Sequence, residues 1–269
     1  MKIAICFYGS TGNLSSFRKN TVKAKSIDIS IPARHYKKFI IDKNPNCEFD
    51  IFCHSSSKGN QQRLTELYNP KYISVEKNPF GIANEHDEFM VRDYANKSRW
   101  YSTWRVNKFR EDYEKDNNKW YQLNKLKYDY VFMTRYDVVF FEGFRFDELD
   151  PEVFYTQGVK YAEIGPEWEK AGRILDWWFV ATPDKMSLFC DAYEHYDEMR
   201  KENIRLQLPS YDQHCFVHQQ FQKYGFKKGQ LLNRCDDNVL CRFIQSKRHD
   251  RTKKDEWIYD TTTQLYRRK

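Results

Sequence analysis

The sequence lacks several features that would each assign it to a well-known class of protein. No stretch approaches the roughly 20 consecutive apolar residues of a membrane-spanning helix, and the segment from Met1 to Phe7 is too short and too soon polar for a secretory signal. The seven cysteines form no C-x-x-C pair, which argues against a zinc site or a redox dithiol. Scattered cysteines in odd number are typical of free thiols. The sequence therefore predicts a cytoplasmic protein without a transmembrane segment.

Four widespread functional motifs are also missing. The chain contains no P-loop, no G-x-G-x-x-G, no G-x-S-x-G and no H-E-x-x-H. These absences argue against P-loop nucleotidases, dinucleotide-dependent oxidoreductases, serine hydrolases and zinc proteases. No internal repeat or low-complexity linker divides the chain.

Charge is nearly balanced except at the C-terminal end. Lys and Arg number 45 against 38 Asp and Glu, a formal net charge of +7. Residues 246–269 contain eight basic and four acidic side chains, so +4 of that charge lies there. We expect a domain over residues 1–245 and a basic extension over 246–269. The extension is either a solvated end or a surface for an anionic ligand or nucleic acid.

Short apolar runs that end in polar loops alternate with segments of helical spacing. The expected strands cover residues 2–8, 47–54, 71–75, 128–134 and 176–181, and the expected helices cover 33–41, 98–110, 183–199 and 210–225. Ser98 is placed to cap the second helix, which the charged stretch from Arg110 should end, and a capping box from Ser210 should start the last. Alternating strands and helices predict an α/β fold with a mixed sheet flanked by helices.

The most informative segment is an apolar strand that runs directly into Arg135-Tyr136-Asp137 and is followed by a second apolar run. Ligands of open α/β sheets bind outside the carboxyl ends of the strands. The loops after Tyr8, His54 and Thr134 should therefore converge on a ligand site.

The order of these parts resembles the GT-A-fold glycosyltransferases that use a nucleotide sugar. The resemblance covers roughly residues 1–245 and rests on Ile3–Thr11, on the segment 128–137 that looks like the strand carrying the D-x-D motif, and on Tyr211-Asp212-Gln213, which resembles the D-Q segment of retaining members. The chain is similar to soluble single-domain glycosyltransferases of large algal viruses and bacterial surface-glycan clusters. The resemblance implies a GT-A-like fold and transfer of a hexosyl or pentosyl group from a nucleoside-diphosphate sugar, with UDP favoured, to a glycan hydroxyl.

The resemblance also implies roles for individual residues. Asp137 and His249 would hold Mn²⁺ or Mg²⁺, which bridges the diphosphate in the family. Arg135 stands where the family motif opens with Asp, so it would either bind a phosphate or form a salt bridge with a nearby acid. The remaining residues expected at the nucleotide are Tyr8, Gly9, Ser10, Thr11, His54, Arg99 and Tyr101.

Two carboxylates are candidates for the catalytic group. Asp176 precedes a pair of tryptophans, of which Trp177 would contact a sugar, and is favoured as base or acceptor ligand. Asp212 would contact the donor sugar together with Gln213, or would cap its helix. Both inverting and retaining chemistry are compatible with these positions.

Two other functions remain as alternatives. A sugar-phosphate nucleotidyltransferase usually has basic residues in a glycine-rich loop after the first strand, whereas Gly9–Asn13 is followed by no Lys or Arg before Arg18. A nucleic-acid-binding protein would use the basic extension, but no aromatic side chains alternate with its charges in a known pattern, so nucleic acid is an unlikely partner. His214 and His218 lie four residues apart, and a third metal ligand at motif spacing is missing.

Overall fold

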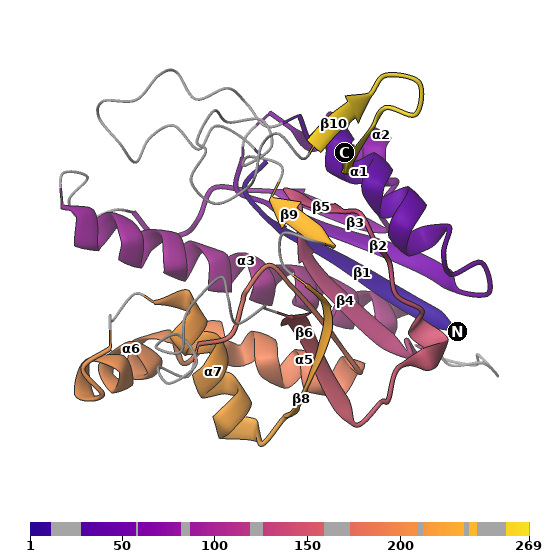
Figure 1. The fold of residues 1–269 in the computed structure, drawn as a ribbon. Coiled ribbons are helices and arrows are strands. Elements are labelled where there is room, and N and C mark those ends of the chain that lie inside the picture. The colour runs from indigo at the N-terminus through magenta and orange to yellow at the C-terminus, as the bar shows by residue number, and fades with distance from the viewer. Residues whose placement is uncertain are drawn as a thin grey trace.

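Seven strands form one sheet through the centre of the protein (Figure 1). The computed structural model describes residues 1–11, 28–57, 59–81, 87–118, 126–158, 173–208, 212–233, 237–240 and 257–268. In sheet order the strands are β3 (Tyr72–Val75), β2 (Glu48–Ser55), β1 (Lys2–Gly9), β4 (Tyr130–Arg135), β7 (Trp178–Ala181), β6 (Val153–Gly158) and β8 (Lys227–Asn233). Strand β7 is antiparallel to both of its neighbours, and all other neighbouring pairs are parallel. The predicted mixed α/β sheet is thus confirmed.

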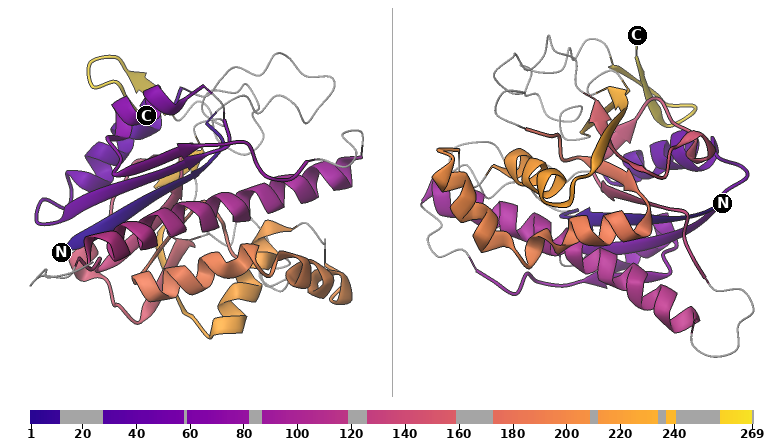
Figure 2. Two further views of the ribbon diagram at one scale, coloured as in Figure 1. Left: turned by 180° about the vertical axis from the view of Figure 1, so that it is seen from behind. Right: turned by 90° about the horizontal axis from the view of Figure 1, so that it is seen from below.

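Helices cover both faces of this sheet (Figures 1 and 2). One face carries α1 (Ser30–Tyr36), which continues as the π-helical turn η2 (Lys37–Ile41), and α2 (Gln61–Tyr68). The other face carries α3 (Glu88–Asn117), α5 (Pro183–Cys190), the 3₁₀ turn η4 (Asp191–Tyr193), α6 (Tyr196–Arg205) and α7 (Gln213–Tyr224). A further 3₁₀ turn, η3 (Phe146–Glu148), precedes β6.

Alternation along β1 builds the two hydrophobic cores, because successive side chains of a strand point to opposite faces. Ile3, Ile5 and Phe7 pack with α1 and α2. Cys6 and Tyr8 pack with the aromatic residues of α3 and α5 on the other face. Tyr8 therefore points toward α3 at the carboxyl end of the strand.

Helix α3 begins ten residues before the expected position. Its N-cap is Asp87, whose carboxylate accepts hydrogen bonds from the amides of Phe89 and Met90 at 2.8 and 3.4 Å. The prediction that Ser98 caps the helix is wrong: Ser98 lies inside it and accepts a hydrogen bond from Asn78 at 2.6 Å. The first turns of α3 carry apolar side chains at Phe89, Met90, Val91 and Tyr94, which the prediction of a helix from Ser98 onward left out.

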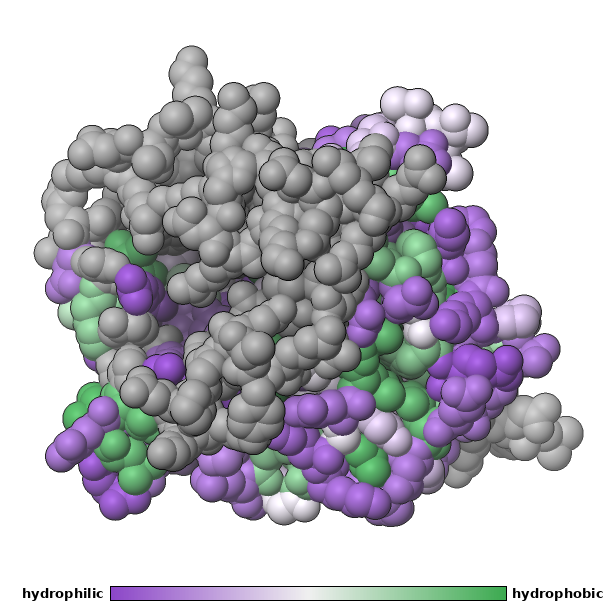
Figure 3. Space-filling view, viewed as in Figure 1, coloured by the Kyte–Doolittle hydropathy of each residue, from purple (hydrophilic) through white to green (hydrophobic). Residues whose placement is uncertain are grey.

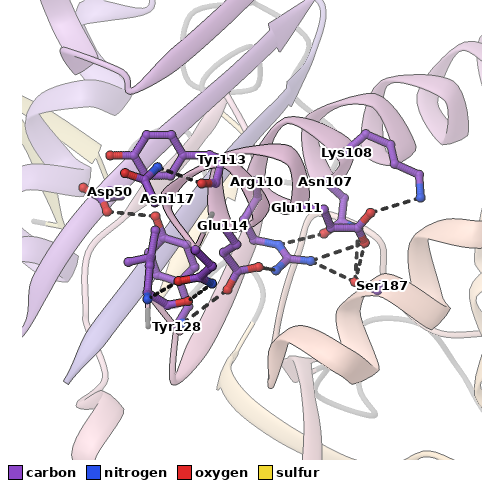
Figure 4. Close-up of polar contacts among 12 residues, drawn as sticks. Asp50, Asn107, Lys108, Arg110, Glu111, Tyr113, Glu114, Asn117, Tyr128 and Ser187 are labelled. Atoms are coloured by element: carbon purple, nitrogen blue, oxygen red, sulfur yellow. Dashed lines mark hydrogen bonds and ion pairs between the residues drawn. The ribbon is translucent and has the colours of Figure 1, made fainter. Parts of the chain in front are cut away.

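The charged stretch from Arg110 also continues α3 instead of ending it. Arg110 is 1% exposed and pairs with Glu111 and Glu114, while its guanidinium donates to Ser187 of α5 at 2.8 Å (Figure 4). Glu114 Oε1 accepts the amide of Tyr128 at 3.3 Å. These paired charges join α3 to α5 and to the segment that enters β4.

The helix expected over residues 183–199 is interrupted. Thr182 is the N-cap and Pro183 lies in the first turn, but α5 ends at Cys190 and η4 separates it from α6. Within α5, Met186 and Phe189 are buried, whereas Leu188 is 41% exposed.

Two small antiparallel sheets complete the described structure. Strand β5 (Val138–Phe140) pairs with β9 (Asn238–Leu240), and β10 (Trp257–Asp260) pairs with β11 (Leu265–Arg268). The β10–β11 hairpin belongs to the basic extension and lies against α1 (Figure 1), where His35 Nε2 accepts the Tyr266 amide at 3.0 Å.

Apolar side chains gather on the surface at the end of α6 (Figure 3). Ile204 of this helix is 58% exposed. Across the described residues, no helix combines the length and the apolar character required to cross a membrane.

Candidate functional site

The ends of three parallel strands meet at one edge of the sheet, as the sequence predicted. In the strand register Tyr8 lies opposite both His54 of β2 and Arg135 of β4. Gly9 lies opposite Ser55. Because parallel strands end at the same edge, the loops that follow them converge there.

Arg135 and Asp137 form a bidentate ion pair at this edge. Arg135 Nε donates to Asp137 Oδ1 at 2.8 Å, and Arg135 Nη2 donates to Asp137 Oδ2 at 2.9 Å. The Asp137 side chain is 5% exposed and that of Arg135 21%. Burial alone would lower the pKa of Arg135, but the Asp137 carboxylate outweighs it and raises that pKa above its usual value. The salt bridge that the sequence left open is therefore present.

This pairing bears on the divalent metal that the resemblance implies. Mn²⁺ and Mg²⁺ take oxygen ligands, yet both oxygens of Asp137 already accept hydrogen bonds from Arg135. Within the described ranges no three His, Cys, Asp or Glu side chains converge to hold a metal ion, and His249 lies outside those ranges. As arranged, these residues do not fit a divalent cation.

Tyr8, Arg99 and Asp176 form a second buried group. Arg99 Nη2 donates to the Tyr8 hydroxyl at 3.1 Å and to the Asp176 carbonyl oxygen at 2.7 Å. The Tyr8 hydroxyl donates to the same carbonyl at 2.9 Å, and burial raises the pKa of Tyr8. The Asp176 carboxylate lies 3.3 Å from Arg99 Nε. Arg99 Nη1 is buried and has no hydrogen-bond partner within the described part of the chain.

Asp212 caps α7, one of the two roles left open for it. Its Oδ1 accepts the amide of His214 at 2.9 Å and its Oδ2 pairs with Arg173 Nε at 2.9 Å. The helix starts at Gln213, whereas Ser210, the predicted cap, lies outside the described residues. His214 Nδ1 lies 3.0 Å from the Ile174 carbonyl oxygen and 3.5 Å from Asp176 Oδ1. Asp212 and Gln213 are thereby brought next to the Asp176 segment.

A chain of hydrogen bonds holds the turn at Gly9. The Gly9 residue has φ of 106°, and its amide donates to Ser102 Oγ of α3 at 2.8 Å. Ser102 Oγ lies 2.6 Å from His54 Nδ1, and His54 Nε2 lies 3.2 Å from Glu76 Oε1. Burial lowers the pKa of His54 to about 4, so the ring is neutral and its Nδ1 accepts the Ser102 proton. Ser102 is only 1% exposed, so it serves the Gly9 turn instead of acting as a nucleophile.

Hydroxyl groups line the next residues of the same edge. Ser10 and Ser57 hydroxyls lie 2.7 Å apart, and Ser57 Oγ accepts the Thr11 amide at 2.9 Å. Asn60 Nδ2 donates to Thr11 Oγ1 at 2.8 Å. The loops after β1 and β2 are therefore fixed to each other by their side chains.

Of the remaining expected residues, Tyr101 joins the chain at Gly9, whereas the Trp177 side chain does not face the edge. The Tyr101 hydroxyl donates to Glu76 Oε1 at 2.8 Å, the same oxygen that lies 3.2 Å from His54 Nε2. Burial, followed by this bond, raises the pKa of Tyr101 to about 12. Trp177 is 4% exposed and packs in the hydrophobic core.

Three residues of this edge escaped the sequence analysis: Glu76, Ser102 and Arg173. Glu76 directly follows β3, so the rule on carboxyl ends of strands could have found it. Ser102 lies three residues after Arg99 on one helix, a spacing that places both toward the same side. Nothing in the sequence pattern indicated Arg173.

Comparison with known proteins adds no family. No protein-family model matches the chain, and no curated protein matches its sequence.

Proposed function

We propose that the protein is a glycosyltransferase that binds a nucleoside-diphosphate sugar, preferably a UDP-sugar, at the carboxyl edge of its sheet. The observation that carries the proposal is the convergence of the ends of β1, β2 and β4 with the segment before β7. Two arginines reach this edge, Arg99 from α3 and Arg135 from β4. Guanidinium groups bind phosphate oxygens well.

The neighbouring polar groups suit the other parts of such a donor. The turn at Gly9 and the hydroxyls of Ser10 and Thr11 form one side of the edge, which we assign to the nucleoside. Arg99 Nη1, a buried donor with no partner among the described residues, supports a ligand with acceptor oxygens.

Asp176 is our choice for the carboxylate at the acceptor. Its carboxylate lies 3.3 Å from Arg99 Nε and 3.5 Å from His214 Nδ1. Asp212, by contrast, is held at 2.9 Å on both oxygens by its cap and by Arg173. In the transfer, the acceptor oxygen bonds to the anomeric carbon as the bond from that carbon to the diphosphate breaks. The nucleoside diphosphate leaves with the bonding electrons, and Asp176 takes the hydroxyl proton.

The five described cysteines, Cys6, Cys47, Cys53, Cys190 and Cys215, are free thiols. Such thiols persist in a reducing cytoplasm, which is where we propose the enzyme acts.

A thermal-shift screen of UDP-, GDP-, CMP- and TDP-sugars tests the proposal, because a ligand that binds only the native state raises its stability. We expect a UDP-sugar to raise the melting temperature. No stabilisation by any nucleotide at millimolar concentration would rule out the transferase. Once a donor is found, Asp176→Asn should reduce turnover by about 10²- to 10⁴-fold while the donor still binds.

A further inference from the structure

The Arg135–Asp137 pair occupies the position at which the D-x-D motif of the resembled family would bind a metal. Here the Arg135 guanidinium already bonds to both oxygens of the Asp137 carboxylate. The backbone of Arg135 is held as well, since the Tyr36 hydroxyl donates to its carbonyl oxygen at 3.0 Å. The Arg135 amide contacts the Trp177 carbonyl oxygen at 3.4 Å. Both the backbone and the side chain of Arg135 are therefore fixed.

We propose that the Arg135 guanidinium takes the place of the divalent cation and contacts the diphosphate directly, with Asp137 as its positioning residue. The inference rests on the proposed function. The ion pair uses Nε and Nη2, whereas Nη1 has no hydrogen-bond partner among the residues that the structure describes. Nη1 and the second proton of Nη2 remain available for phosphate oxygens. The side chain is partly exposed, so a ligand can reach these donors.

The charge and burial of the pair favour this division of roles. The Asp137 carboxylate is almost fully buried and both of its oxygens bond to Arg135, so a cation would have to compete with the guanidinium for them. Displacement would leave the arginine without its partner in a partly desolvated place, which is unfavourable. An arginine that is already oriented binds a diphosphate without that rearrangement.

The chain contains a matched control pair of the same spacing. Arg145 donates from Nε to Asp147 Oδ1 at 2.9 Å, and its Nη2 also pairs with Asp147. The Arg145 side chain is 43% exposed and lies before η3, away from the strand ends that form the site. Substitution of Arg145 thus removes a similar ion pair without touching the site.

Calorimetric titration of UDP in EDTA and in Mn²⁺ tests the inference. Wild type should bind UDP equally well in both conditions. Arg135→Gln should weaken binding in EDTA by about 10- to 100-fold, and Asp137→Asn should weaken it less, because the amide keeps one acceptor for Arg135. Arg145→Gln should leave the affinity unchanged.

Arg135→Asp is the most telling variant, since it restores two carboxylates at the spacing of a D-x-D motif. This variant should bind UDP in Mn²⁺ and lose binding in EDTA. If wild type binds UDP only in Mn²⁺ and Asp137→Asn abolishes that binding, the inference is wrong and the proposed function stands. If wild type binds no nucleotide in either condition, the proposed function fails as well. Melting temperatures of all variants distinguish loss of binding from loss of folding, with Arg135→Lys as a second variant that keeps the charge.

Discussion

At the scale of single residues, Arg110 carries a charge that is almost fully buried outside the site. Its guanidinium is buried under α5 and depends on Glu111 and Glu114 for compensating charge (Figure 4). Burial raises the pKa of Glu114, and Arg110 opposes that rise. Removal of the arginine would take the cation away from the partly buried Glu114, whereas Glu111 would keep its ion pair with Lys108 at 3.0 Å.

Arg110→Ala should therefore lower the free energy of unfolding by about 3 to 5 kcal/mol, the usual cost of breaking a buried ion pair from one side. Urea denaturation measures this change in the free energy of unfolding. Arg205→Ala is the control, because its pair with Glu202 is exposed to solvent and should contribute little to stability. Equal losses of unfolding free energy in the two variants would show that the ion pairs of Arg110 do not stabilise the fold.

At the scale of secondary-structure elements, one histidine joins the C-terminal hairpin to the main domain. His35 of α1 donates from Nδ1 to the Phe140 carbonyl oxygen of β5 at 2.6 Å and accepts the Tyr266 amide of β11 at Nε2. Arg34 Nε adds a bond to the Gln264 carbonyl oxygen at 2.9 Å. The neutral ring is required, since only an unprotonated Nε2 accepts.

His35→Leu should loosen the hairpin while the central sheet stays folded. A lost hydrogen bond of about 1 to 2 kcal/mol corresponds to roughly 5- to 30-fold faster exchange of the Tyr266 amide. Hydrogen exchange of Tyr266, with Ile5 in β1 as internal reference, measures the effect. Unchanged exchange at Tyr266 would mean that His35 does not hold the hairpin.

At the scale of the whole molecule, two buried histidines make stability depend on pH. Burial lowers the pKa of both His35 and His54 to about 4, from an unperturbed value of 6.5. Between those values the unfolded chain binds more protons than the native one. The free energy of unfolding should therefore be highest above the pKa that histidine has in the unfolded chain, and it should fall as the pH drops toward 4.

Each of these two histidines should lower the free energy of unfolding by about 2 kcal/mol as the pH falls from about 7 to about 5. Urea denaturation at the two pH values tests this, with His35→Leu and His54→Leu each expected to reduce the pH dependence by its own share. His195→Leu, at a partly exposed position, is the control. A pH dependence that survives both buried substitutions would assign it to other groups.

The sequence predicted the sheet and the convergence of its strand ends because these depend on local patterns. Apolar runs such as Ile3–Tyr8 specify strands, and parallel strands bring their ends together. It did not predict the start of α3 after Asp87 or the interruption after Cys190. The Ser102–His54–Glu76 chain and the Arg173–Asp212 pair join distant segments, so only the fold brings them together.

The account depends most on a nucleoside diphosphate binding at the carboxyl edge of the sheet. Hydrogen exchange of the protein with and without saturating UDP tests this claim most directly. We predict slower exchange at Gly9–Thr11, Ser55–Ser57 and Arg135–Asp137, with no change at Glu48 and Tyr130, which begin β2 and β4 at the opposite edge. Protection confined to the hairpin of residues 257–268, or no protection at any amide, would contradict the account.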